Sequence, residues 1–381
     1  MGLNGCLQFI RNKFPHLLTN EHISKYAHQR VIVDIASYIY KYACIHGLDS
    51  NAWTNSFINL ILLFKTNKVN PIIVFDGKPP VEKSDELGER KEKKNQTLDK
   101  INLLETSFNN YNSNSYTQDD IDTLKSIVYK IESKGKSIRR LLINEAPILT
   151  TLELSEIKDY ISKLKQTVVF ITPSHFDKMK HILNTIGVPF IQAIGEAEGY
   201  CCFLVKEGIG KAVVSCDTDC IAHGATNIIF NIDMYGYISH LNINKLYEDF
   251  KLDENSIKDF GILIGCDYNR KHKIPKIGPV SALKLLQKHN KIENIPNIVY
   301  DIDEINKIRL LFTVDGDKDI VISKQDINLT ELENLVKNNN LDKSIIPRLL
   351  ESQNKQTEFA YLEQENQIET ENQVDTEFFK K

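Results

Sequence analysis

Three short apolar runs that each end in an aspartate constrain the fold of this chain more than any other feature. They lie at 30–34 (RVIVD), 71–76 (PIIVFD) and 211–217 (KAVVSCD). Continuous apolar runs of this length are typical of buried parallel strands, because both faces of such a sheet are covered. Helical patterns separate them, for example at 56–66 and 197–207. The alternation predicts an α/β fold with a central, mainly parallel sheet flanked by helices.

The ends of these strands predict the place of a binding site. Ligands of open α/β sheets bind outside the carboxyl ends of the strands, where Asp34, Asp76 and Asp217 fall. Asp219 follows Asp217 by two positions, and in an extended chain such residues point to the same side. We therefore expect a cluster of carboxylates at this edge of the sheet.

Three further acids extend the cluster. Glu196 and Glu198 follow Gly195. Two residues this close cannot share a face within a regular helix, where neighbours on one face are three or four positions apart. We therefore expect a helix to start here, where irregular backbone lets the two side chains converge and the helix dipole favours acids. Asp267 follows the apolar run FGILIGC, where burial of an uncompensated charge is costly. Any one of these acids alone is more often a solvated carboxylate or a helix cap. That explanation does not account for all seven together.

The seven acids favour a site for divalent metal ions. Hydrolysis of a phosphodiester by two metal ions needs several carboxylates around ions roughly 3.5–4 Å apart. Mg²⁺ and Mn²⁺ both prefer oxygen ligands. The sequence predicts a nuclease with two Mg²⁺ ions, for which Mn²⁺ can substitute, and with these metal ligands: Asp34, Asp76, Glu196, Glu198, Asp217, Asp219 and Asp267.

The rest of the chain divides by composition. Residues 1–80 and 166–350 form the N-terminal and internal nuclease regions of the predicted fold. Between them, 81–165 is charged and rich in helical patterns, so we expect an insertion standing above the sheet. Residues 351–381 are rich in Gln, Asn and Glu and have too few apolar residues to become ordered.

The charge of the chain is unevenly distributed. Of the net charge of −4, residues 351–381 contribute −5, so the residues before them carry +1. Because that part contains the seven acids, its remaining surface must be basic somewhere. The segment 270–291 holds seven Lys and Arg residues and no acid, which favours phosphate binding. Within it, Gly278 is expected to permit a tight turn and Pro279 to begin a helix.

The seven cysteines indicate a reducing compartment. They are odd in number, lack a Cys-x-x-Cys pair and mostly lie in apolar runs, so we expect buried thiols and neither zinc nor disulfides.

No stretch reaches the roughly 18 apolar residues of a membrane span, and the N-terminus has no signal-peptide pattern. Cys6 stands where a myristoylation signal has Ser or Thr. We expect an intracellular monomer without membrane association, nuclear in a eukaryotic cell, or in the cytoplasm or replication compartment for a large DNA virus.

A series of motifs joins these features along the chain: MGLNG, VIVDIASYIY, VFDGKPP, KSDELGER, GVPFIQAIGEAEGYC, SCDTDCIAHG, and ILIGCDYN followed by IPKIGPVSALKLLQKH. In this order they resemble the flap endonucleases of the XPG/RAD2 structure-specific 5′ nuclease superfamily, from Met1 to about residue 350. The resemblance implies a PIN-like 5′-nuclease fold. It also implies that 81–165 forms an enlarged helical arch and that about 262–290 forms a helix-two-turn-helix element that binds DNA.

The resemblance implies roles for single residues. Lys83 and Arg90, at the base of the arch, contact the scissile phosphate, although without this context they would be assigned to a solvated helix face. Tyr40 stacks on a substrate base, a contact that tolerates any sequence. The amine of Gly2 approaches the active site once Met1 is removed. The metal ligands divide into two positions, with Asp34, Asp76, Glu196 and Glu198 around one, and the catalytic Asp217 with Asp219 and Asp267 around the other.

The helix-two-turn-helix element is implied to grip duplex phosphates and to hold a K⁺ ion through loop carbonyls. Such contacts give affinity without reading sequence, as a structure-specific enzyme requires. The residues implied to bind DNA here are Lys273, Lys276, Gly278 and Lys284.

The implied activity is endonucleolytic and 5′-exonucleolytic cleavage of branched DNA, chiefly 5′ flaps, in replication, repair and recombination. An exonuclease 1-like or Holliday-junction-resolving nuclease, or an RNA-directed nuclease on the same scaffold, remains an alternative. The 106 positions from Arg90 to Glu196 keep these open, since compact flap endonucleases have fewer. A nucleic-acid-binding scaffold without catalytic activity would lack some of the metal-binding acids, and none of the seven is missing. A second basic group either touches DNA or is solvated: Lys134, Lys136, Arg139 and Arg140.

The last residues, 376–381 (TEFFKK), resemble the paired aromatics of a sliding-clamp-binding peptide. Asn372 and Asp375 stand where that motif needs Gln and an aliphatic residue. We therefore expect no strong binding to a sliding clamp.

Overall fold

The computed structural model describes residues 2–48, 51–134, 149–270, 273–314, 316, 322 and 326–353, and of 132–134 the backbone alone. Several predicted features lie outside the described residues, namely the tail from 354 onward with its clamp-like peptide, and Lys136, Arg139, Arg140 and Lys271. The chain divides into two compact units. The first comprises Met1–Ile39, Asn51–Glu86 and Thr172–Lys381, and the second Tyr40–Ser50 and Leu87–Ile171.

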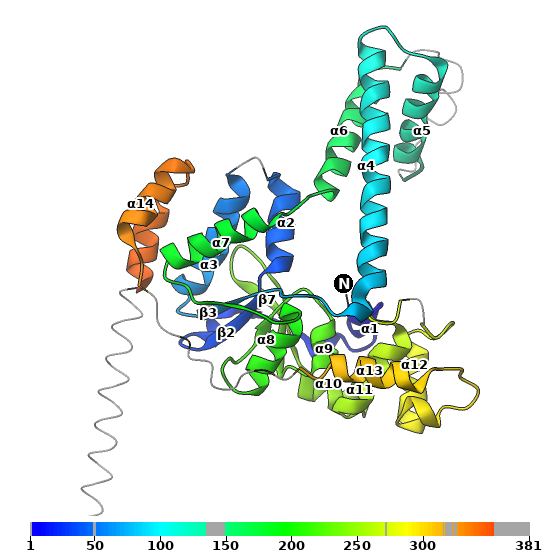
Figure 1. The fold of residues 1–381 in the computed structure, drawn as a ribbon, viewed down its shortest axis with the longest axis vertical. Helices are drawn as coiled ribbons and strands as arrows, with labels where there is room; N and C mark the ends of the chain where they lie inside the picture. Colours follow the sequence, from blue (N-terminus) through cyan, green and yellow to red (C-terminus); the bar gives the residue numbers. More distant parts are fainter. Residues whose placement is uncertain are drawn as a thin grey trace, which may run out of the picture. The chain divides into compact units, whose positions relative to one another are not determined.

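A mixed sheet forms the centre of the first unit (Figure 1). Its order is β1-β7-β6-β5-β2-β3-β4, with β4, β3, β2, β5 and β6 parallel to their neighbours and β7 antiparallel to both β6 and β1. The prediction of a mainly parallel sheet is confirmed. The strands are β1 (Leu18–His22), β2 (Arg30–Asp34), β3 (Asn70–Phe75), β4 (Phe190–Gln192), β5 (Val213–Val214), β6 (Asn227–Ile232) and β7 (Tyr237–Asn242).

Helices surround this sheet and build the second unit. The first unit holds α1 (Cys6–Lys13), α3 (Ala52–Thr66), α7 (Pro173–Thr185), α8 (Ala197–Lys206), α9 (Asp219–His223), α10 (Ile243–Phe250), α11 (Glu254–Ile264), α12 (Pro279–His289), α13 (Ile302–Leu311) and α14 (Leu329–Asn338). It also holds the 3-10 helices η1 (Pro15–Leu17), η2 (Ile23–Tyr26), η3 (Val81–Lys83) and η5 (Ile292–Asn294). Two helices, α2 (Ala36–His46) and α4 (Ser84–Asn112), continue into the second unit, which adds α5 (Gln118–Lys134) and α6 (Thr151–Thr167).

Apolar side chains cover both faces of the sheet. Ile32 and Val74 face the main core cluster, where α8 packs against β2 and β3. Val33 and Ile73, which alternate with them, are equally buried, and α3 packs against β3. Figure 1 shows α3 and α7 on one face and α8 and α10 on the other. Burial on both faces explains why the central strands are continuous apolar runs.

The strand order reverses between β2 and β5. From β2 the chain proceeds through β3 to β4 on one side, and it then returns to β5 and β6 on the other side. This switch point is where ligands of open α/β sheets bind. The prediction that Asp217 ends a strand is wrong, because β5 stops at Val214 and a short irregular segment with a bend at Cys216 leads to Asp217.

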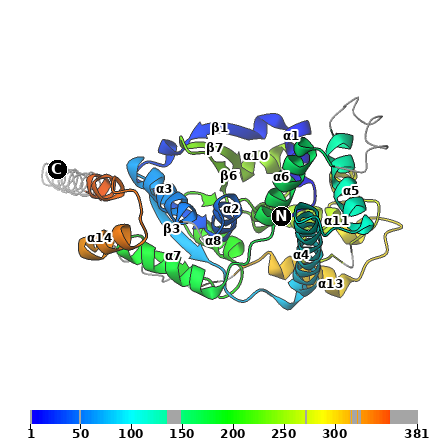
Figure 2. The same cartoon turned by 90° about the horizontal axis from the view of Figure 1, so that it is seen from above.

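The second unit has a core of its own. Leu104 of α4, Leu124 of α5 and Ile157 of α6 belong to one buried apolar cluster. Figure 2 looks along α4, with α5 and α6 beside it. A capping box between Thr150 and Glu153 fixes the start of α6. Separate cores explain why this part of the chain is a unit distinct from the sheet.

Two further expectations concern cysteines and membranes. All seven cysteines are free thiols, and the prediction of buried thiols is confirmed for all of them except Cys216, which is exposed, and Cys44, which is partly exposed. Within the described ranges, every helix is too short or too polar to span a bilayer.

Candidate active site

The first two acids follow neighbouring parallel strands. Asp34 is the last residue of β2, and Asp76 comes directly after β3. The Ala36 N–H donates to Asp34 Oδ1 at 3.2 Å. The Ala197 N–H, at the start of α8, donates to Asp76 Oδ1 at 2.9 Å. Hydrogen bonds from chain segments that follow or face the strands therefore hold both carboxylates at the sheet edge.

Glu196 and Glu198 lie at the start of α8, as their spacing predicts. Glu196 is the N-cap residue with extended angles (φ −76°, ψ 141°), and Glu198 lies in the first turn. Both carboxylates reach Lys83, whose ammonium bonds Glu196 and lies 3.6 Å from Glu198 Oε1. The change from extended to helical backbone lets acids two positions apart converge, and the helix dipole favours their charge.

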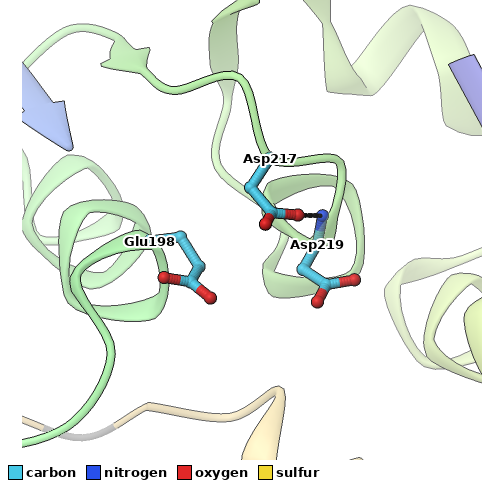
Figure 3. Close-up of side chains that lie close together, drawn as sticks. All are labelled: Glu198, Asp217 and Asp219. Carbon is cyan, nitrogen blue, oxygen red and sulfur yellow. Dashed lines mark hydrogen bonds between the residues drawn. The ribbon is translucent and has the colours of Figure 1, made fainter. Parts of the chain in front are cut away.

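Asp217 and Asp219 converge through a helix start rather than an extended chain. Thr218 between them is helical (φ −81°, ψ −9°), and α9 begins at Asp219. Asp217 Oδ1 accepts a hydrogen bond of 3.0 Å from the Asp219 N–H (Figure 3). The predicted proximity is present, but the reason given for it is wrong. Glu198, Asp217 and Asp219 each present an oxygen within 4.8 Å of the others.

Asp267 completes the cluster from the turn after α11. Its Oδ1 lies 3.1 Å from Arg270 Nη2. Its Oδ2 lies 3.7 Å from the Lys83 ammonium, which is itself buried. Lys83 thus joins Asp267 to Glu196 and Glu198. With the group of Glu198, Asp217 and Asp219 and the strand-end acids, the structure brings all seven predicted acids into one cluster.

Ser215 is a site residue that the sequence reasoning missed. Its hydroxyl donates to Asp34 Oδ2 at 2.7 Å and accepts from the Asp217 N–H at 3.0 Å. Ser215 directly follows β5 and is fully buried. One side chain therefore links the two sides of the switch point. The available signal was a polar residue at the end of an apolar strand, two positions before Asp217.

Crowding of the acids disfavours their charged forms. Burial, with the charges of Asp76 and Asp217, raises the pKa of Asp34 to about 7. Burial and the charge of Asp217 raise the pKa of Asp219 well above its usual range. Burial disfavours the charge of Lys83, but Glu198 and Glu196 outweigh burial and raise its pKa. The cluster thus holds more negative charge than its protein cations balance, which favours binding of further positive charge.

Buried carboxylate oxygens that accept no hydrogen bond fit a divalent metal ion. Three buried oxygens accept no hydrogen bond from the described residues: both carboxylate oxygens of Asp219, and Oε1 of Glu198. Buried carboxylate oxygens without donors are costly unless a cation compensates them. A set of ligands made only of carboxylate oxygens suits hard divalent cations.

Gly2 lies against the turn that carries two of the acids. It has a positive φ of 78°, and a side-chain carbon there would lie 2.1 Å from Asp217 Oδ1 and 2.8 Å from Thr218 Oγ1. Glycine is therefore required at this position for both conformation and space. The chain start packs beside Asp217, where the resemblance places it.

The basic segment before α12 has the expected helix start but not the expected turn. Pro279 is the first residue of α12, as predicted. Gly278 is extended (φ −110°), a conformation that any residue adopts, so its predicted role in the turn is wrong. The left-handed residue is instead Lys276 (φ 64°). Lys273, Lys276, Gly278 and Lys284 are all exposed.

Two family patterns match the parts of the chain that carry the acids. The XPG N-terminal domain matches residues 1–97, and the XPG I-region matches 187–267. Together these stretches contain all seven acids. The chain belongs to the XPG/RAD2 nuclease family. Residues 98–186, which include α5 and α6, lie outside both matches.

Similar proteins come from viruses and animals. The probable RAD2-like endonuclease 369L of Invertebrate iridescent virus 6 is 27% identical over 315 residues, which is 77% of this chain and 73% of that protein. Flap endonuclease 1 of Homo sapiens is 24% identical over 310 residues, covering 77% of this chain and 68% of that protein.

Solved structures show the same fold. The catalytic core of Rad2 in complex with DNA substrate (complex III) has a TM-score of 0.62 at 17% identity, covering 91% of this chain and 100% of that one. Flap endonuclease-1 from Methanococcus jannaschii has a TM-score of 0.56 at 17% identity, covering 91% of this chain and 99% of that one.

Two predicted DNA contacts of this XPG/RAD2 family member belong to its second unit. Tyr40 lies on α2 with 44% of its surface exposed, and Arg90 is exposed on α4. Exposure leaves both side chains accessible to a substrate. Their roles in binding DNA stay predictions.

Asp34 offers a pH test on the metal-free nuclease. Its pKa rises on folding from 3.8 to about 7, so the folded state binds this proton more tightly than the unfolded state. Asp34 therefore destabilises the fold progressively as the pH rises from 3.8 to about 7, and by a constant amount above that. We expect Asp34→Asn to raise the free energy of unfolding in urea with EDTA, by an amount that grows across this interval.

The control for this test is Asp159→Asn, which removes an exposed acid of α6. It should change the free energy of unfolding by a similar small amount at each pH. A constant difference between wild type and Asp34→Asn from pH 3.8 to 7 would contradict the raised pKa.

Proposed function

We propose that this chain is a structure-specific 5′ nuclease that hydrolyses phosphodiester bonds of branched DNA, chiefly at 5′ flaps, in replication, repair or recombination. The observation that carries the proposal is the cluster of seven acids at the strand switch point, with buried carboxylate oxygens that lack hydrogen-bond donors among the described residues. The endonuclease names of its relatives and the DNA substrate bound by the Rad2 core support it.

The proposed cofactor is a pair of Mg²⁺ ions, which Mn²⁺ can replace. The ions would supply Lewis-acid chemistry, lowering the pKa of water and stabilising charge on the leaving oxygen. Asp217 and Asp219 lie close to Glu198 and would hold one of the two ions. We assign Asp34, Asp76, Glu196 and Glu198 to one metal position. We assign Asp217, Asp219 and Asp267 to the other.

Lys83 is the proposed contact to the scissile phosphate. Its ammonium lies among Glu196, Glu198 and Asp267, and the acids keep it charged. A charged donor at this place can bond a phosphate oxygen and stabilise charge that develops there. We propose the same role for Arg90, which lies on α4 in an arch built from α4, α5 and α6. For Tyr40 of α2 we propose stacking on a substrate base.

Exposed lysines next to α12 are the proposed grip on duplex phosphates. Lys273 and Lys276 precede the helix, which begins at Pro279, and Lys284 lies on it. A helix start with surrounding cations binds phosphate without reading bases. We propose that loop carbonyls of this element also hold a K⁺ ion.

The double substitution Lys273→Ala and Lys284→Ala tests this grip. We expect weaker binding to every duplex sequence and a plot of log affinity against log salt that is shallower by about two, because each lysine that neutralises a phosphate adds about one to the slope. Fluorescence anisotropy with Ca²⁺ and labelled flap DNA measures both quantities. The control is Lys337→Ala, an exposed lysine of α14. An unchanged salt slope in the double variant would place the grip elsewhere.

A panel of labelled substrates with Mg²⁺ tests the proposed function itself. It contains a 5′ flap, a nicked duplex, a four-way junction and an RNA flap. We expect the fastest cleavage on the DNA flap, close to the junction of single and double strands. Preference for the four-way junction, the nick or RNA would support the respective alternative, and no cleavage of any substrate would support a silent binding scaffold.

We further propose that the protein acts as a monomer where DNA is replicated, either in a nucleus or in the replication compartment of a large DNA virus. Its residues 376–381, outside the described residues, are proposed not to bind a sliding clamp strongly. Light scattering of the pure protein and a clamp titration measure the two properties.

A further inference from the structure

Tyr268 is a buried residue that lies among the seven carboxylates but carries none itself. It follows Asp267 and is 6% exposed. Its hydroxyl donates to Glu196 Oε2 at 2.7 Å. The Lys83 ammonium bonds the other oxygen of the same carboxylate and lies 5.9 Å from the centre of the Tyr268 ring. Glu196 is thus held by one neutral and one charged donor.

Glu196 depends on these donors more than its neighbours do. It is the N-cap residue of α8, but its side chain makes no capping hydrogen bond to the helix. A glutamate side chain has several rotatable bonds, so a carboxylate without fixed partners samples many orientations. Asp217, in contrast, is fixed by the backbone N–H of Asp219. Lys83 and Tyr268 therefore set the direction of the Glu196 carboxylate.

The Tyr268 ring is itself held in place. It packs edge-on against Phe312 with 5.4 Å between ring centres, and Phe312 packs in the same manner against His223 at 5.3 Å. The carbonyl oxygen of Phe312 lies 3.2 Å from Nδ1 of His223, which belongs to α9. This buried row of rings positions the hydroxyl without help from Lys83.

We propose that Tyr268 is a positioning residue, whose hydroxyl holds the Glu196 carboxylate in the orientation that binds a divalent metal ion. The role rests on the proposed function, since it assumes that Glu196 is a metal ligand. Partners behind metal ligands commonly change metal affinity about 10- to 100-fold when they are removed. Tyr268 keeps this bond when Lys83 turns to a phosphate, because a phenol stays protonated at neutral pH.

The test is Tyr268→Phe, which removes the hydroxyl and keeps the ring that packs on Phe312. Mn²⁺ binding to the metal-free full chain is measured by electron paramagnetic resonance, and unfolding by circular dichroism in EDTA. We expect an affinity about 10-fold lower with an unchanged thermal midpoint. In the cleavage assay, the half-saturating Mg²⁺ concentration should rise by the same factor, and saturating Mg²⁺ should largely restore the rate.

The matched control is Tyr26→Phe. Tyr26 is also buried, and among the described residues its hydroxyl has no hydrogen-bond partner. It should bind Mn²⁺ as wild type does. Affinity of Tyr268→Phe within twofold of wild type would overturn the positioning role alone. A wild-type protein that binds no Mn²⁺ would instead overturn the proposed function on which the role rests.

Discussion

The Asp219→Asn substitution is expected to lower the rate of flap cleavage by about 10³-fold or more, which corresponds to roughly 4 kcal/mol of activation free energy. Asp219 is fully buried, and among the described residues neither of its carboxylate oxygens accepts a hydrogen bond. Its carboxylate therefore has no structural partner to lose. The expected loss of rate comes from loss of a metal ligand.

The same substitution should not weaken the metal-free fold. Asparagine keeps the shape of the side chain and the backbone N–H that bonds Asp217. It also removes the negative charge of Asp219, which the nearby charges of Asp217 and Asp267 disfavour. We expect the metal-free variant to be as stable as wild type or more stable, by on the order of 1 kcal/mol. Mg²⁺ should raise the thermal midpoint of wild type but hardly that of the variant.

Rates on the labelled flap and thermal midpoints with EDTA or Mg²⁺ measure both effects. Glu333→Gln, which removes an exposed acid of α14, is the control and should change neither. Cleavage by Asp219→Asn at the wild-type rate would rule out the assignment of Asp219 as a ligand. A fall in metal-free stability of several kcal/mol would instead indicate a structural role.

The strand-end acids could be predicted because period and strand direction are local properties. A run such as RVIVD indicates a buried strand, and parallel strands bring their carboxyl ends to one edge. The edge strands β1 and β4 were not predicted, because this kind of prediction needs a clear local pattern. β1 is half-buried and polar (LTNEH), and β4 has three residues, so neither has a pattern that exceeds the background.

The supporting contacts could not be predicted, because they join distant parts of the chain. Lys83 and Glu196 are separated by 113 positions, and Tyr268 and Glu196 by 72. No local pattern distinguishes a lysine that turns into an acidic cluster from one on a solvated helix face. Ser215 is similar, since a serine after a strand is common in loops. Only packing of the whole first unit selects these partners.

The Lys83→Met substitution is expected to give the opposite stability change from Asp219→Asn. Lys83 is 7% exposed, bonds Glu196 and lies 3.6 Å from Glu198 and 3.7 Å from Asp267. Methionine keeps the aliphatic stem but leaves these acids without their ammonium partner. Loss of one partner from a buried ion pair costs about 3–5 kcal/mol, so the metal-free protein should be destabilised by that order.

Divalent metal should compensate for this loss of stability but not for the loss of catalysis. Metal ions supply the positive charge that the acids lack, so Mg²⁺ should raise the thermal midpoint of Lys83→Met more than that of wild type. Cleavage should remain about 10²-fold slower even at saturating Mg²⁺, because the proposed donor to the scissile phosphate is absent. Thermal unfolding and single-turnover cleavage across a Mg²⁺ titration measure the two responses.

The control is Lys258→Met, at a lysine that is equally buried but outside the acidic cluster. Its ammonium donates to Thr313 Oγ1 at 2.8 Å. We expect this variant to lose stability equally with and without Mg²⁺ and to cleave at the wild-type rate. If Lys83→Met behaved in the same way, Lys83 would be a structural lysine. A destabilisation that Mg²⁺ reverses, together with slow cleavage, assigns Lys83 to both the charge balance of the cluster and the reaction.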